Sequence, residues 1–560
     1  MAYDLESVDL PVLQGPALKL FVKLLETESV GDVMCKKLLA DTGFANLRDR
    51  VLNEAPTLQP LHVSESPDPK RSSPKLHAVA PSPRQRLGWQ PNTCADYTAA
   101  YREGRLSPED VAQRVIKAIE DSNRGPTPLR AIIASRADDI RTQAKASSER
   151  YRRGEPLSPL DGVPVSVKDE LDQRGYPTTV GTAFMGRSTA QRDATPVARL
   201  RSLGALLIGK VNMHEIGIGV TGFNAHHGVP QNPYKLGHYT GGSSSGSASS
   251  VAAGLCPLSV GADGGGSIRI PAGLCGINGL KATYGRISEH GAAPLCWSVA
   301  HVGPMGVTAR DTALGYLAMA GPDPLDPLSC HQPDVTLDGF GESDLTGIKI
   351  GIYEPWFNHA SDSMVRACRS RLDELVTHGA ELVAIEIPDL DLVRLAHLVT
   401  IASEMRTAMD VHYPNKRSLF GLDVRTNLAL ASRFTSLDYV KAQRIRTESI
   451  KTMLDLFDRI DLIASPTTGC TSPAIPDSAL PDGISDLGQI TEIMRFAPLA
   501  NLTGLPAISV PAGYDSSNLP IGLQFHARPW NEALLLKTAW IVESHHQRIA
   551  PEVSFNLLRS

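Results

Sequence analysis

A serine that follows three consecutive glycines is the residue in this sequence best suited to nucleophilic chemistry. The segment reads Gly261-Ala-Asp-Gly-Gly-Gly-Ser267-Ile-Arg269. Glycines can adopt positive φ angles and point successive N–H groups into one concavity, which is how an anion nest or an oxyanion hole is built. One such donor typically contributes about 2.7 to 4 kcal/mol to transition-state stabilisation. Ser267 is therefore a candidate nucleophile, with Gly264, Gly265 and Gly266 as candidate donors.

A serine hydroxyl needs a base, and Lys168 is a candidate for that role. It ends the apolar stretch VPVSVK, residues 163–168, which predicts a buried strand. Desolvation there would favour the neutral amine, which can accept a proton. The alternative is a surface lysine that closes a strand, and periodicity alone favours that alternative.

The segment that leads to Ser267, residues 241–267, is not an ordinary linker. More than half of residues 241–267 are Gly or Ser, and Asp263 carries the only charge. Val251, Ala252 and Ala253 predict a helix of small residues that ends at Gly254, and residues 255–260 predict an apolar strand. Small residues in a helix let a neighbouring backbone approach closely.

The same segment contains a rival catalytic motif. Gly242-Ser243-Ser244-Ser245-Gly246 satisfies GxSxG, which would make Ser244 the nucleophile of a Ser-His-Asp α/β-hydrolase. Such a serine needs a strand directly before it, whereas QNPYKLGHYT is turn-like. The 16 histidines leave this alternative open.

The elements around these residues predict an α/β fold. Residues 163–168, a helix that opens at Thr195-Pro196, and residues 205–210 follow one another as strand, helix and strand. Ser107 should cap a helix whose apolar residues repeat at helical spacing. Near the other end, PAISVP and PIGLQF flank a turn and precede a helix. We predict one large catalytic domain over residues 92–560.

The residues before this domain divide into two parts. Residues 1–55 form a predicted helical extension, in which residues 16–26 place Leu18, Phe21, Val22 and Leu25 on one face. This helix would contact a membrane surface or gate the substrate, or it would pack on the protein body. Residues 56–91 hold eight prolines and predict a linker or wrapping arm.

Composition excludes several classes of protein. The 560 residues carry 55 Lys plus Arg and 60 Asp plus Glu, and no basic stripe predicts a nucleic-acid partner. Eight scattered cysteines fit neither a zinc site nor a disulfide framework. Without a secretory leader or an apolar span, we expect an intracellular location, cytoplasmic or peripheral to an internal membrane.

Three segments together resemble the amidase signature family: VPVSVKDE, TGGSSSGSASSVAAGL and GADGGGSIRIPAGLCGINGLKATYGR. Its members use a Ser-Ser-Lys triad. By resemblance, Ser267 attacks the carbonyl, Ser243 relays the proton, and Lys168 is the base that later returns the proton to the leaving amine.

The resemblance also implies supporting groups and a fold. The N–H groups of Gly264, Gly265, Gly266 and Ser267 would form the oxyanion hole, with Arg269 and Asp263 in supporting positions. The implied fold is α/β/α, with a central mixed twisted sheet covered by helices. Neither a metal nor an organic cofactor is needed.

Further segments, among them GPALKLFVKLLE, GKVNMHEIGIGVTGFN and MRFAPLANLTGLPAISVPAGY, resemble the plant-type branch of fatty acid amide hydrolases. This implies N-acylethanolamines or related N-acyl amides as substrates, a place in lipid metabolism, and a homodimer. Gly217 and Thr221 would face the substrate. Met494 and Phe496 would line an acyl channel, for which core packing is the alternative. An aryl-acylamidase or a carbamate hydrolase of the same family is the alternative function.

Overall fold

The structure is a computed structural model that describes residues 3–7, 11–62, 76, 79 and 87–559. Most of the proline-rich segment predicted as a linker or wrapping arm lies outside the described residues. Its described start lies against the protein body: the Thr57 N–H donates to the Gln443 carbonyl at 3.2 Å, and His62 Nε2 lies 2.9 Å from the Thr503 carbonyl oxygen.

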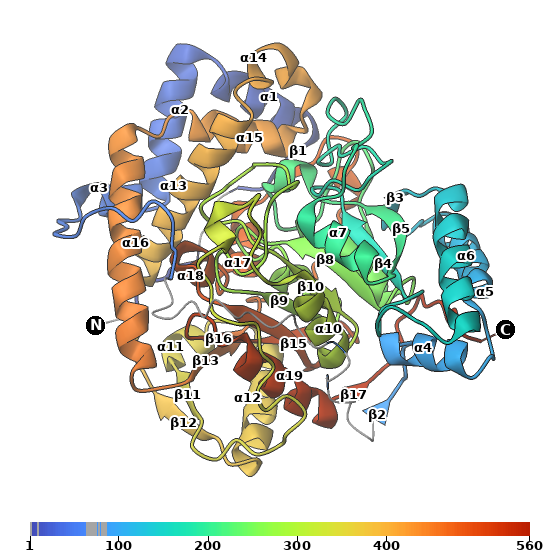
Figure 1. Ribbon diagram of the computed structural model, residues 1–560. Coiled ribbons are helices and arrows are strands. Elements are labelled where there is room, and N and C mark those ends of the chain that lie inside the picture. The colour runs from blue at the N-terminus through green and yellow to red at the C-terminus, as the bar shows by residue number, and fades with distance from the viewer. Residues whose placement is uncertain (1–2, 8–10, 63–75, 77–78, 80–86, 560) are drawn as a thin grey trace.

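A mixed sheet forms the centre of the molecule (Figure 1). The strands β11 and β12, β11 and β13, β4 and β5, and β4 and β8 pair in parallel, and the other neighbours are antiparallel. In spatial order, the described strands of this sheet are β12 (Glu381–Ala384), β11 (Lys349–Ile352), β13 (Leu462–Pro466), β16 (Pro520–Ala527), β15 (Ala507–Tyr514), β9 (Asn278–Lys281), β10 (Val302–Gly306), β8 (Leu258–Ala262), β4 (Pro164–Lys168), β5 (Leu206–Val211) and β3 (Ile132–Ala134).

Central strands such as β4 and β5 are buried along their whole length, as expected for apolar strands covered on both faces. The α-helices that follow the N-terminal extension are α4 (Cys94–Arg102), α5 (Pro108–Ser122), α6 (Ala137–Arg153), α7 (Thr195–Ser202), α8 (Ser245–Ala252), α9 (Arg269–Leu274), α10 (Ala309–Met319), α11 (Glu354–Phe357), α12 (Asp362–Thr377), α13 (Leu390–Ala408), α14 (Tyr413–Lys416), α15 (Leu422–Ala431), α16 (Ser436–Phe457), α17 (Leu487–Met494), α18 (Pro498–Thr503) and α19 (Glu532–His545). Three further strand pairs are β1 (Leu13–Gln14) with β14 (Ile484–Ser485), β2 (Leu87–Gly88) with β17 (Gln547–Arg548), and β6 (Gln231–Asn232) with β7 (Lys235–Tyr239).

The predicted elements are present. The capping box of Ser107 and Asp110 starts α5, as the sequence indicated. Helices α7, α10, α19 and α12 form a row in which each packs on the next, while α8 packs on β8 and β4. The predicted α/β class with a helix-covered mixed sheet is confirmed.

The N-terminal extension forms three helices, α1 (Gly15–Leu25), α2 (Glu28–Asp41) and α3 (Phe44–Asp49). Helix α1 packs on α2 and α15, and α3 packs on α13 and α16, so segments far apart in sequence lie side by side at the top and left of Figure 1. Leu18, Val22 and Leu25 are buried. The apolar face of α1 therefore packs on the protein body. None of the described helices is long and apolar enough to cross a membrane.

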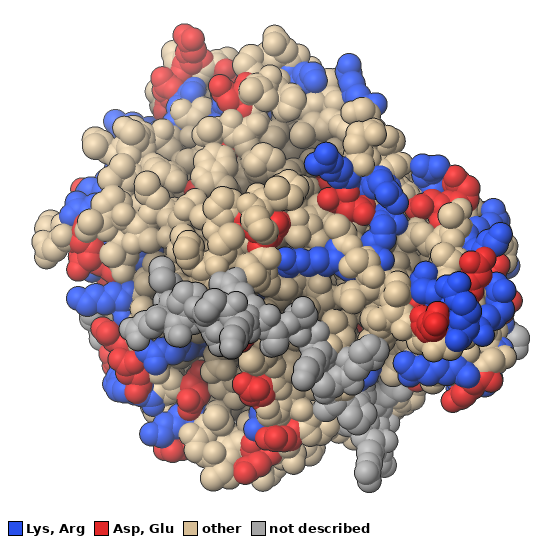
Figure 2. Space-filling model, viewed as in Figure 1, with Lys and Arg blue, Asp and Glu red and all other residues tan. Residues whose placement is uncertain are grey.

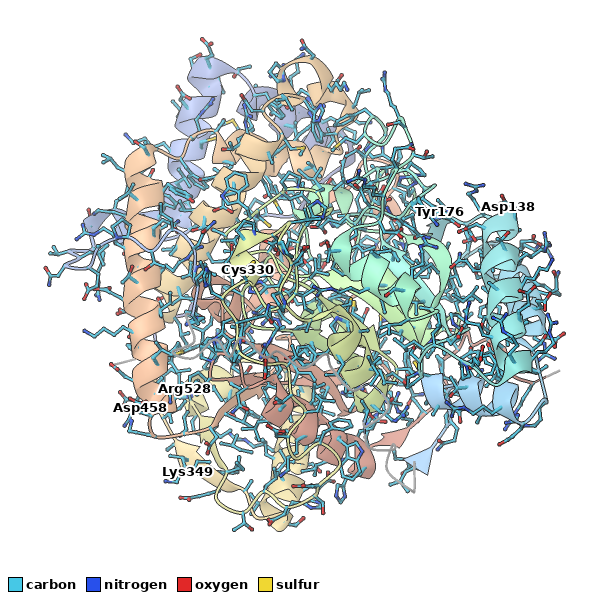
Figure 3. The ribbon with its side chains drawn as sticks, viewed as in Figure 1. Asp138, Tyr176, Cys330, Lys349, Asp458 and Arg528 are labelled. Atoms are coloured by element: carbon cyan, nitrogen blue, oxygen red, sulfur yellow. The ribbon has the colours of Figure 1, made fainter. Side chains whose placement is uncertain are left out.

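Charge is distributed without separation by sign on the face shown in Figure 2, where basic and acidic residues alternate over α5 and α6. Figure 3 shows Asp458 beside Arg528 at the lower end of α16, where their ion pair of 2.7 Å joins this helix to the end of β16. Both side chains are at least half exposed, so the pair contributes at most about 1 kcal/mol. Burial of apolar faces, rather than surface ion pairs, holds the layers together.

One buried histidine makes the fold sensitive to acid. His526 on β16 is fully buried and stacks on Trp356 with ring centroids 6.3 Å apart. Burial, with Arg269 and Lys281 nearby, lowers the pKa of His526 to about 3. The unfolded value is about 6.5.

We expect the folded state to lose stability as the pH falls from about 6.5 toward 3, because the unfolded chain takes up a proton that folded His526 does not. Above about pH 6.5 the folded state has its full stability with respect to this group. By pH 5, His526 alone should lower the free energy of unfolding by about 2 kcal/mol. In His526→Leu that part of the pH dependence should disappear. Urea unfolding at pH 7.5 and pH 5 measures the difference, with substitution of the exposed His331 as the control. An unchanged pH dependence in His526→Leu would contradict the assignment.

Candidate active site

Lys168 is placed by the end of β4, between the two parallel neighbours β5 and β8. Its side chain is 1% exposed. The amine Nζ lies 2.9 Å from Ser243 Oγ and donates to the Ala262 carbonyl at 3.0 Å. The sequence left open a surface lysine that closes a strand; the structure instead buries this lysine against Ser243.

The helix that follows Ser243 packs closely on neighbouring backbone, and this packing places Ser243 beside Lys168. Ser243 stands just before α8, whose residues are all buried. A Cβ at Gly246 in this helix would lie 2.3 Å from the Ala131 carbonyl oxygen, so only glycine fits there. The small residues of the predicted helix thus let α8 pack against the backbone beside β3 and β5.

Ser244, the nucleophile of the rival hydrolase motif, has a structural role. Its side chain is fully buried, and its Oγ donates to the Ala262 carbonyl at 3.1 Å. Its N–H donates to the Ser267 carbonyl at 3.2 Å. In the described part of the chain no histidine hydrogen-bonds Ser244. The hydrogen bond from the Ser244 N–H to the Ser267 carbonyl instead joins the segment of Ser243 to the glycine turn.

Glu170 is a member of the site that sequence reasoning missed. Its carboxylate lies 2.8 Å from Lys168 Nζ, and both side chains are buried. Glu170 follows Lys168 by only two residues, and a carboxylate so near a candidate base in the chain is the signal that could have found it. The carboxylate therefore helps to hold the Lys168 amine in its place beside Ser243.

The glycine turn is held by a buried ion pair. Asp263 Oδ2 accepts from Arg269 Nε at 3.0 Å, and both side chains are fully buried. Burial alone would raise the pKa of Asp263, but Arg269 and further donors hold it below its ordinary value. Arg269 also donates to Gln524 on β16 at 2.7 Å and to Asn501 on α18 at 2.6 Å. The predicted supporting residues Asp263 and Arg269 therefore fix the turn to two other elements.

The N–H groups of the turn divide into used and free donors. The Gly266 N–H donates to Asp263 Oδ1 at 2.6 Å, so it is occupied in this structure. The N–H groups of Gly264, Gly265 and Ser267 make no hydrogen bond to the described part of the chain. Gly266 itself has φ +110°, a conformation that favours glycine.

A cavity of about 200 Å³ opens at the turn, and both Ser267 and Gly265 line it. Gly217, Thr221 and Met494 also line this cavity. Helices α13 and α17 contribute six of its apolar lining residues: Leu398, Ile401, Ala402, Leu487, Ile490 and Met494. The arrangement can therefore hold an apolar chain beside Ser267.

Phe496 lies elsewhere. Its ring is fully buried against Trp356, with centroids 5.2 Å apart, and it does not belong to the cavity lining. Of the two residues predicted for an acyl channel, the structure thus places Met494 at the cavity and Phe496 in the core. The sequence had named core packing as the alternative for both.

Comparison with known proteins places the chain in a family. A model of the amidase family matches residues 110–536. The chain is 39% identical to a fatty acid amide hydrolase of rice, Oryza sativa subsp. indica, over 97% of this chain and 94% of that protein. It is 34% identical to a glutamyl-tRNA(Gln) amidotransferase chain of Desulfotalea psychrophila, over 80% of this chain and 95% of that protein.

The fold agrees with these matches. The structure of a peptide amidase from Stenotrophomonas maltophilia superposes with a TM-score of 0.71 and 27% sequence identity, covering 83% of this chain and 99% of the other. A family model that spans most of the chain, relatives that match nearly all of it, and the shared fold agree with the resemblance seen in the three sequence segments. The chain belongs to the amidase family, and the reaction it catalyses is the hydrolysis of an amide.

Proposed function

We propose that this amidase acts inside the cell on N-acyl amides with a long apolar acyl chain, such as N-acylethanolamines, through an acyl-enzyme on Ser267. The observation that carries the proposal is the 2.9 Å contact between Lys168 Nζ and Ser243 Oγ, in a buried site tied to the turn that presents Ser267 to the cavity. The similarity to a rice fatty acid amide hydrolase supports the substrate class.

The first half of the reaction forms the ester. Ser267 Oγ attacks the amide carbon while its proton passes to Ser243, and the proton of Ser243 passes to neutral Lys168. The carbonyl π electrons move onto oxygen, and the oxyanion accepts hydrogen bonds from the free N–H groups of the turn. When the C–N bond breaks, its electron pair leaves with nitrogen, and the ammonium of Lys168 returns the proton through Ser243 to the amine.

The second half releases the acid. A water attacks the acyl carbon and gives one proton along the same path to Lys168. Collapse breaks the bond to Ser267 Oγ, which recovers a proton through Ser243. The products are one carboxylic acid and one amine, and every group of the site returns to its starting state.

The proposal also includes a homodimer and a peripheral membrane contact, the two associations that the sequence resemblance implied. Leu20 on α1 is 58% exposed and Val33 on α2 is 71% exposed, which is the kind of surface either association would cover. Light scattering measures the first association, and co-sedimentation with phospholipid vesicles measures the second. A monomer that stays in the supernatant would remove both.

Ser267→Ala should abolish turnover and covalent labelling by a fluorophosphonate, because the attacking oxygen is gone. Mass spectrometry of the intact protein measures the label, and hydrolysis of a long-chain N-acylethanolamine measures turnover. Ser245→Ala, a change in the same buried segment, is the control and should keep labelling. Labelling that persists in Ser267→Ala would reject this nucleophile.

The proposed preference for a long acyl chain is tested by comparing several amides as substrates of the unmodified enzyme. Apolar walls on α13 and α17 should give a long-chain N-acylethanolamine a higher kcat/KM than acetanilide, a simple carbamate or glutamine, because each buried CH₂ contributes about 0.8 kcal/mol. Equal kcat/KM values across the panel would exclude the fatty amide assignment and favour an aryl-acylamidase or a carbamate hydrolase.

Glu170→Gln should lower kcat/KM, because the amide keeps the shape of the side chain but loses the carboxylate that holds Lys168 Nζ at 2.8 Å beside Ser243. Steady-state hydrolysis of a long-chain N-acylethanolamine measures the change. Glu289→Gln is the control: burial raises the pKa of Glu289 well above its usual range, so the substitution removes less charge. An unchanged kcat/KM in Glu170→Gln would show that this carboxylate does not hold the base in place.

A further inference from the structure

The peptide groups of the glycine turn are oriented by side chains of α18, of α13 and of the turn itself. The Asp263 carbonyl accepts from Asn501 Nδ2 on α18 at 2.9 Å. The Gly266 N–H is taken by the Asp263 carboxylate. The peptide between Gly264 and Gly265 is held from the opposite side, by His397 on α13, whose Nε2 lies 2.8 Å from the Gly264 carbonyl oxygen.

The imidazole of His397 packs directly on this peptide. Its side chain is 1% exposed, and a Cβ at Gly265 would lie 2.8 Å from His397 Cε1. Burial lowers the pKa of His397 to about 4, so the ring is neutral near pH 7. Because the Gly264 carbonyl can only accept, the single ring proton must be on Nε2.

This hydrogen bond determines where the next N–H points. In a trans peptide the C=O and the following N–H point in opposite directions. Once His397 holds the Gly264 carbonyl on its own side, the Gly265 N–H is directed away from the imidazole. That N–H makes no hydrogen bond to the described chain, and Gly265 lines the cavity beside Ser267.

The same helix also forms a wall of the cavity. His397 is followed on α13 by Leu398, Ile401 and Ala402, which line the space for the acyl chain. The residue that holds the turn and the residues that would contact the chain therefore belong to one rigid element.

We propose that His397 is a positioning residue that fixes the Gly265 N–H as an oxyanion donor, a role that rests on the proposed acyl-enzyme mechanism at Ser267. Among the described residues its imidazole makes no hydrogen bond to Lys168, Ser243 or Ser267, and its Nε2 is bonded to the Gly264 carbonyl. Its contribution is to prevent the peptide between Gly264 and Gly265 from turning, so that the donor is in place before the oxyanion forms.

The test compares His397→Phe, which fills the space without a donor, with His397→Gln, which retains an N–H. Loss of one oriented oxyanion donor should lower kcat on the order of 100-fold in His397→Phe, with KM changed by less than about threefold. The rate of fluorophosphonate labelling should fall in parallel, because the phosphoryl oxygen occupies the same hole. His397→Gln should recover most of both rates.

Ser403→Ala is the matched control on the same helix. Ser403 does not line the cavity, and its Oγ makes no hydrogen bond to the described residues, so this variant should keep kcat, KM and the labelling rate. If His397→Phe does not fold, His397→Met carries the same comparison with His397→Gln.

Two results would overturn the role of His397: an unchanged kcat in His397→Phe or His397→Met, or equal losses in the glutamine and the apolar variants. Failure of the underlying mechanism looks different, since Ser267→Ala would then keep turnover and labelling. An inactive Ser267→Ala beside a fully active His397→Phe would reject the positioning role alone.

Discussion

The buried ion pair between Asp263 and Arg269 is the contact on which the rest of the site depends. The Asp263 carboxylate accepts hydrogen bonds from the N–H groups of Gly266 and Ile268, while Arg269 donates to Gln524 on β16. Desolvating two charges costs several kcal/mol per ion, and their attraction offsets this only where every remaining donor and acceptor is satisfied. Removal of one partner from such a pair typically costs about 3 to 5 kcal/mol. The pair therefore holds the turn in one conformation rather than simply adding stability.

Backbone proximity is the second constraint, because three segments must meet within hydrogen-bond distance. The amine at the end of β4, the residue before α8, and the carbonyl that ends β8 converge where Lys168 contacts Ser243 and Ala262. A side chain larger than hydrogen at Gly246 would push α8 away from its neighbours. The Gly and Ser content of this segment is thus a packing requirement, and it explains why a composition typical of linkers forms a fully buried helix.

Local patterns were enough to predict several elements and the segment that holds the glycine turn, while the resemblance of three longer segments indicated the family. Strands 164–168 and 206–211 follow from continuous apolar residues, and the start of α5 follows from its capping box. His397 could not be found in this way, because it reaches the turn from a helix more than a hundred residues away and its neighbours indicate only helix packing. Phe496 shows the converse problem: apolar periodicity marks burial but does not distinguish a core from a cavity wall.

Charge balance determines what this site can stabilise. Two buried cations each face a carboxylate: Lys210 with Asp169 at 3.1 Å, and Arg269 with Asp263 at 3.0 Å. Because these charges are already paired, they add little to the binding of the neutral amide in its ground state. An oxyanion, in contrast, accepts hydrogen bonds from oriented N–H groups only as it forms. Binding energy for the ground state then has to come from the apolar walls of α13 and α17.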